Sequence, residues 1–95
     1  MLQKVKKANE INETVADVIV AQFRAHARKT GISKTSYDEF DIQKIAQAVT
    51  PEWYLASTFG VSEALNTVHG VKAVYDDSLQ IGPSEWLEVI HLTLD

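Results

Sequence analysis

Cysteine is absent from the 95-residue sequence, which excludes disulfides, thiol nucleophiles and cysteine-ligated zinc. Only four glycines and two prolines occur, too few for a long flexible linker or a glycine-rich phosphate loop. No apolar run exceeds four residues, whereas a membrane-spanning helix needs about 20. We therefore expect one small domain over residues 1–95, with residues 1–8 as a flexible tail. The expected location is the cytoplasm, without contact to a membrane.

Charge is divided unequally between the two parts of the chain. Residues 1–34 contain seven of the nine Lys and Arg side chains and three acids, a local charge of +4. Residues 35–95 contain two basic and ten acidic side chains, a local charge of −8. Because nucleic-acid binding depends on neutralising phosphates, this acidic majority makes a nucleic-acid partner an unfavoured interpretation.

Apolar residues recur at three- and four-residue spacing between residues 10 and 29, which predicts an amphipathic helix. Asn9 is suited to cap its first turn. Arg28 and Lys29 suit the negative end of the helix dipole, and Gly31 follows where a left-handed residue is often needed.

Three further helices are predicted from capping patterns. Ser36 and Glu39 have the spacing of a capping box, followed by an apolar stripe that predicts a helix over 37–49. Pro51 favours a short helix that ends at Gly60. A fourth helix is expected to begin at Ser62.

The last third of the sequence is compatible with two structures. Residues 71–81 could form a hairpin, and apolar and polar residues alternate from Ile90 onwards as in a strand. The spacing of Leu87, Ile90 and Leu94 also fits a helix, which we favour for residues 84–93. The predicted fold is therefore mainly α, a small bundle of four to five helices, with an α+β fold containing a C-terminal hairpin as the alternative.

Glu88 and His91 form a Glu-x-x-His pair, a spacing that places both side chains on one face of a helix. Metal sites of that kind need several such residues on facing helices, and this chain contains a single pair. A small metal-dependent enzyme is therefore a remote alternative. We assign no catalytic residue, no metal ligand and no cofactor.

Residues 51–69 allow a second functional interpretation. Ala56, Gly60, Val61 and Ser62 match the turn of a helix-turn-helix unit. The following residues offer no basic side chain before Lys72, which is unfavourable for DNA binding. A small DNA-binding regulator is kept as the alternative function.

The main functional hypothesis is a non-enzymatic protein-binding module of adapter or inhibitor type. Its partner would contact an acidic surface within residues 35–95 and would itself have a basic surface, because complementary charge raises association rate and selectivity. Trp and Tyr are common interface anchors. A phage or plasmid accessory inhibitor would fit this class, and a homodimer is expected. The candidate partner-binding residues are Trp53, Tyr54, Asp38, Glu39, Asp41, Asp76 and Asp77.

Overall fold

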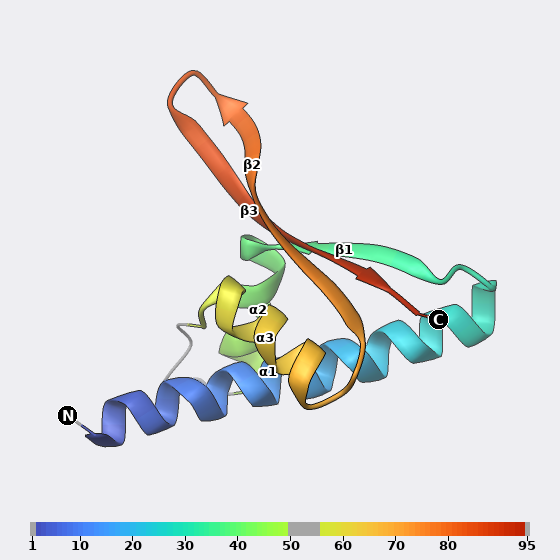
Figure 1. Cartoon of the computed structure of the whole chain (residues 1–95), viewed down its shortest axis with the longest axis horizontal. Coiled ribbons are helices and arrows are strands. Elements are labelled where there is room, and N and C mark those ends of the chain that lie inside the picture. The colour runs from blue at the N-terminus through green and yellow to red at the C-terminus, as the bar shows by residue number, and fades with distance from the viewer. Residues whose placement is uncertain (1, 50–55, 95) are drawn as a thin grey trace.

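The computed structural model describes residues 2–49 and 56–94, and within them it contains three helices and three strands. All three helices lie on one side of the sheet, and the helix α1 extends beneath the other elements (Figure 1). The elements in chain order are α1 (Leu2–Thr30), β1 (Lys34–Asp38), α2 (Glu39–Val49), α3 (Thr58–Thr67), β2 (Lys72–Gly82) and β3 (Glu85–Thr93).

The sheet overturns the predicted helix bundle. Its strand order is β1-β3-β2, and both neighbouring pairs are antiparallel. The fold is therefore α+β, which was the alternative interpretation of the sequence. Because β3 is the central strand, it receives hydrogen bonds from both sides, and this pairing replaces the helix that we predicted for residues 84–93.

The predicted first helix is confirmed and is longer than the pattern indicated. It extends from Leu2 to Thr30 and so includes most of the residues predicted as a tail. Arg28 and Lys29 occupy its last turn. Gly31 has a φ of 75° and its N–H donates to the carbonyl of Ala27 at 2.8 Å, which ends the helix as expected.

Replacing Gly31 with alanine should lower the free energy of unfolding by about 1 kcal/mol, because a Cβ is strained at positive φ. An added Cβ would meet no atom within 4 Å, so the loss would come from the backbone alone. Urea unfolding measures it, and Gly31→Asn, which tolerates this conformation better, should lose less. Equal losses for both variants would contradict the backbone explanation.

The start of the second predicted helix lies two residues later than expected. The Asp41 N–H donates to Asp38 Oδ1 at 2.9 Å, and the Asp38 N–H donates to Asp41 Oδ2 at 3.1 Å. These reciprocal bonds form the capping box that we predicted for Ser36 and Glu39. Residues 34–38 are free to form β1 because the cap lies at its end.

The helix α3 contains the end of the helix predicted to stop at Gly60 and the start of the helix predicted to begin at Ser62. It begins after Ser57, whose hydroxyl accepts from the Gly60 N–H at 3.0 Å, and it continues to Thr67. Gly60 and Ser62 therefore lie inside one helix rather than at a break between two helices. The turn of the helix-turn-helix alternative is not formed at these residues.

The strands β2 and β3 form a hairpin that is longer than the predicted one. The middle of the segment 71–81, at Asp76–Ser78, is not a turn but a bulge, where the pairing shifts between Asp76 and Leu79. The chain reverses after Gly82, before Glu85. The end of this hairpin projects beyond the helices and β1 (Figure 1).

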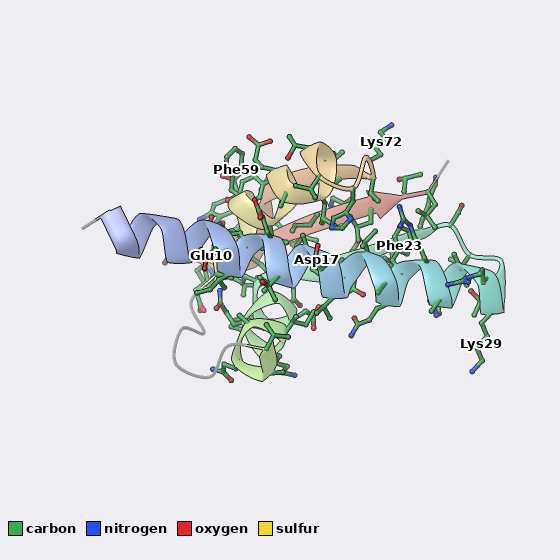
Figure 2. The ribbon with its side chains drawn as sticks, turned by 90° about the horizontal axis from the view of Figure 1, so that it is seen from below. Glu10, Asp17, Phe23, Lys29, Phe59 and Lys72 are labelled. Atoms are coloured by element: carbon green, nitrogen blue, oxygen red, sulfur yellow. The ribbon has the colours of Figure 1, made fainter. Side chains whose placement is uncertain are left out.

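The core lies between the helices and one face of the sheet. Phe23 and Ile19 of α1 are almost completely buried, with Leu65 of α3 and Ile90 and Leu92 of β3. Figure 2 labels Phe23 where α1 passes beneath the sheet. Burial of Ile90 and Leu92 on one side of β3 explains the alternating pattern at the end of the sequence.

Among the described residues, no helix is both long and apolar enough to cross a bilayer.

Candidate functional site

The sheet and α2 bring the predicted acidic residues together. Asp38 of β1 and Asp76 of β2 both lie opposite Val89 of the central strand. Glu39 follows Asp38 directly, and its Oε1 accepts from the Glu88 N–H at 3.0 Å. Acids that are 35 or more residues apart in sequence thus form one region, which we call the acidic surface: Asp38, Glu39, Asp41, Asp76 and Asp77.

Most of the acidic surface also has a structural role. Asp38 and Asp41 cap α2, and Glu39 ties α2 to the sheet. Asp77 is exposed beside the bulge. Trp53 and Tyr54, the predicted aromatic anchors, lie outside the described residues.

Asp76 holds the bulge in place. Its Oδ1 accepts from the Ser78 N–H at 2.9 Å and from the Ser78 hydroxyl at 2.5 Å. The hydrogen bonds from Ser78, followed by that from His91, lower the pKa of the Asp76 carboxyl to about 2. Asp76 therefore stays charged at every pH near neutrality and contributes a permanent negative charge to the acidic surface.

His91 connects all three strands on the face opposite the helices, which we call the open face. Its Nδ1 lies 2.9 Å from the Ser36 hydroxyl of β1, and its Nε2 lies 3.2 Å from Asp76 Oδ2 of β2. Serine, histidine and aspartate also form catalytic triads, where serine contacts Nε2 and aspartate contacts Nδ1. The order of the nitrogens is reversed here. We assign this chain of hydrogen bonds a cross-strand structural role.

The predicted Glu88–His91 pair is not formed. Because β3 is a strand, residues three apart point to opposite faces of the sheet. Glu88 accepts a short hydrogen bond from the Tyr75 hydroxyl on the helix side, whereas His91 lies on the open face. No group of three or more His, Asp or Glu side chains in the described part of the chain is arranged to hold a metal ion.

Tyr75 of β2 packs the hairpin against α3. Its ring packs edge-to-face on Phe59, with 5.3 Å between the ring centroids and an interplanar angle of 87°. The hydrogen bond to Glu88, followed by burial and nearby acids, raises the pKa of Tyr75 to about 12. Ionising the phenol would place a second negative charge beside the Glu88 carboxylate.

The free energy of unfolding should fall as pH rises from about 10 to 12. In this window the unfolded Tyr75 loses its proton near the ordinary pKa, while the folded side chain keeps it until about 12. Unfolding measured against pH should show a shallower decline for Tyr75→Phe, which has no proton to lose. Identical slopes for the two proteins would contradict the assigned contact with Glu88.

Cations gather at the end of the molecule opposite the acidic surface. Lys34 and Lys72 lie on either side of Thr93 at one end of the sheet. Figure 2 shows Lys29 and Lys72 toward the same end of α1, away from Glu10. We call this region the basic end: Arg24, Arg28, Lys29, Lys34 and Lys72.

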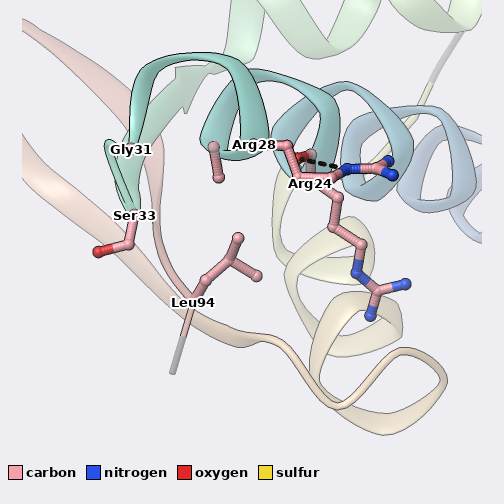
Figure 3. Close-up of a pocket in the computed structure, with 6 residues that line it drawn as sticks. Arg24, Arg28, Gly31, Ser33 and Leu94 are labelled. Carbon is pink, nitrogen blue, oxygen red and sulfur yellow. Dashed lines mark hydrogen bonds between the residues drawn. The ribbon is translucent and has the colours of Figure 1, made fainter.

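A pocket of about 590 Å³ lies within the basic end. Arg24 and Arg28 of α1 line it together with Gly31, Ser33 and Leu94 (Figure 3). The Nε of Arg28 donates to the carbonyl of Arg24 at 3.5 Å, a long contact along the exposed side of the helix. Arg28, predicted only as a helix-end charge, thus also lines a pocket, for which no local pattern in the sequence is a signal.

The outer end of the β2–β3 hairpin exposes large apolar side chains. Leu79, Ile81 and Trp86 are 46%, 53% and 57% exposed. Asp77 and Glu85 flank them along the two strands. We call residues 77–87 the arm. The exposure of Trp86 follows from the pairing of β2 with β3, which carries this segment beyond the core.

Comparison with family models, curated proteins and solved structures finds no match to this chain.

Proposed function

We propose that this chain is a non-enzymatic protein-binding module, of adapter or inhibitor type, that holds a partner with a basic surface. The observation that carries the proposal is the arm, where Leu79 and Trp86 on opposite faces of the hairpin, and Ile81 near its turn, are about half exposed. Large apolar side chains exposed among polar groups are typical of protein interaction sites.

The structure of the arm supports a partner in a second way. A two-stranded hairpin is marginally stable in water unless another strand or a hydrophobic face covers it. The arm lies beyond β1, which pairs with β3 only from Val89 to Thr93. A bound protein would bury Ile81 and Trp86 and supply the missing cover.

Charge selects the kind of partner. Asp77 and Glu85 belong to the arm, Glu39 lies at its base beside Glu88, and Asp41 lies beside Asp38. Lysine or arginine side chains of a partner would meet these carboxylates while its apolar residues meet Trp86. Such complementarity accelerates association and discriminates against acidic partners.

Affinity capture with the tagged protein tests this function. Trp86→Ala should reduce recovery of a specific partner by tenfold or more, because buried aromatic anchors contribute about 2 kcal/mol or more. Val68→Ala, which trims an exposed side chain directly after α3, is the matched control and should leave recovery unchanged. Equal recovery by both variants would overturn the role of the arm.

The charge preference has its own comparison. Asp77→Lys should weaken capture at low salt more than Glu63→Lys, which makes the same charge change on α3. Both residues are exposed, so neither change should alter folding. Equal weakening would show that a general charge effect, rather than the acidic surface, governs binding.

A further inference from the structure

The open face of the sheet carries its charges in two opposed rows. Lys34 and Lys72 flank Thr93 in one row, and Asp38 and Asp76 flank Val89 in the other. Four residues along a strand separate the rows, a distance of about 13 Å. Ser36, His91 and Val74 form the row midway between them.

We propose that this face pairs with the same face of a second copy of the chain, about a two-fold axis through the His91 row. An axis lying across the strands reverses their direction in the second copy. The lysine row of each copy then faces the aspartate row of the other. Residues on the middle row face their own equivalents, as an isologous interface requires.

Charge complementarity under this symmetry is complete. Lys34 of one copy faces Asp38 of the other, and Lys72 faces Asp76. Both aspartates make bonds within their own chain, yet a carboxylate has about four acceptor positions and keeps some for an incoming ammonium group. A parallel arrangement of the two copies would place like charges together and is disfavoured.

The middle row is compatible with close contact. Val74 is 49% exposed and would meet its equivalent across the axis. In the neighbouring aspartate row, Val89 is buried but does not belong to the main core cluster, which agrees with its position on the open face. His91 is held by Ser36 and Asp76, so its ring is already fixed in position.

The size of the face sets the strength of the interaction. The face measures roughly 10 Å across the strands and 13 Å along them. The area that these lengths enclose is far below the roughly 800 Å² per partner of a standard interface. We therefore expect a weak dimer that depends on its ion pairs. Glu39, Asp41, Asp77 and Trp86 lie outside the paired rows and stay accessible to the partner proposed above.

Sedimentation equilibrium of the purified protein tests the dimer at ~20 mM and ~500 mM salt, where charge screening is weak and strong. Reversible dimerisation at low salt should be lost at high salt. A monomer at low salt, or a dimer whose dissociation constant does not change with salt, would overturn the proposal. The measurement needs no other protein, so its failure is separate from failure of the proposed function.

Charge-swap variants locate the interface. Lys72→Glu should raise the dissociation constant about tenfold or more at low salt, because the symmetric interface loses two ion pairs. Adding Asp76→Lys to that variant reverses both partners and should restore the dimer. Lys44→Glu changes an exposed charge on α2 and should leave association unchanged.

A second variant avoids the role of Asp76 in the bulge. Lys34→Glu with Lys72→Glu leaves both aspartates intact and makes the whole open face acidic. It should be monomeric at low salt while its circular dichroism and urea midpoint match those of the parent. A dimer that persists in this variant would overturn the proposed face, whatever the folding of the Asp76→Lys protein.

Discussion

Phe23→Ala should lower the free energy of unfolding by about 3–5 kcal/mol. Phe23 is 1% exposed and is the largest fully buried side chain among the described residues. It belongs to the cluster that joins α1 to α3 and the sheet, with Ile19, Leu65 and Leu92. Truncation removes the transfer free energy of the ring and leaves a cavity where close neighbours cannot fully relax.

Urea unfolding measures this loss, and Phe40→Ala is the matched control. Phe40 is 60% exposed on α2, so the same truncation there should cost less than about 1 kcal/mol. A domain with a total stability of about 5–15 kcal/mol would lose a large part of it through Phe23→Ala. Similar losses at both positions would contradict the placement of the core.

Gly60→Val should lower the free energy of unfolding by about 2–3 kcal/mol, because it overpacks the contact between α1 and α3. A Cβ at Gly60 would lie 2.3 Å from Asn12 Nδ2. Asn12 cannot turn away freely, since its Oδ1 accepts from the Ser57 N–H at 3.0 Å, directly before α3. The same glycine donates to the Ser57 hydroxyl.

A double-mutant cycle separates the clash from other effects of the substitution. Asn12→Ala alone loses one hydrogen bond, worth about 1 kcal/mol. In the Asn12→Ala background Gly60→Val should cost clearly less than in the parent, because the obstructing amide is gone. Additive losses would show that Asn12 is not the group that requires glycine at this position.

Local signals in the sequence identified part of the fold. The apolar stripe and the glycine after it predicted the helix α1, because a long amphipathic helix depends on spacing within one segment. The capping box of α2 was predicted two residues too early. Ser36 and Asp38 are both chemically able to cap a helix, and the local pattern does not show that residues 34–38 pair with β3.

The error in the last third has the same origin. Leu87, Ile90 and Leu94 fit a helical stripe, whereas Ile90, Leu92 and Leu94 fit a strand. Periodicity over ten residues could not separate the two. The strand forms because residues 85–93 can pair with β1 on one side and β2 on the other while Ile90 and Leu92 are buried.

The candidate sites were predictable to different degrees. The acidic residues were found from composition, since ten acids against two cations in residues 35–95 leave unbalanced negative charge. The Ser36–His91–Asp76 chain joins residues as far apart as 55 positions, and no local motif indicates it. The arm was missed because exposure of Trp86 depends on where the hairpin ends relative to the core.

The sequence by itself determined the long first helix, its glycine end and the excess of acid in residues 35–95. Its division into a basic and an acidic segment suggested two charged surfaces without showing their arrangement. Only the tertiary structure placed Lys72, from the acidic segment, beside Lys34 at the basic end. The reason is physical: antiparallel pairing fixes which distant residues share a row, and a sequence states their order but not their register.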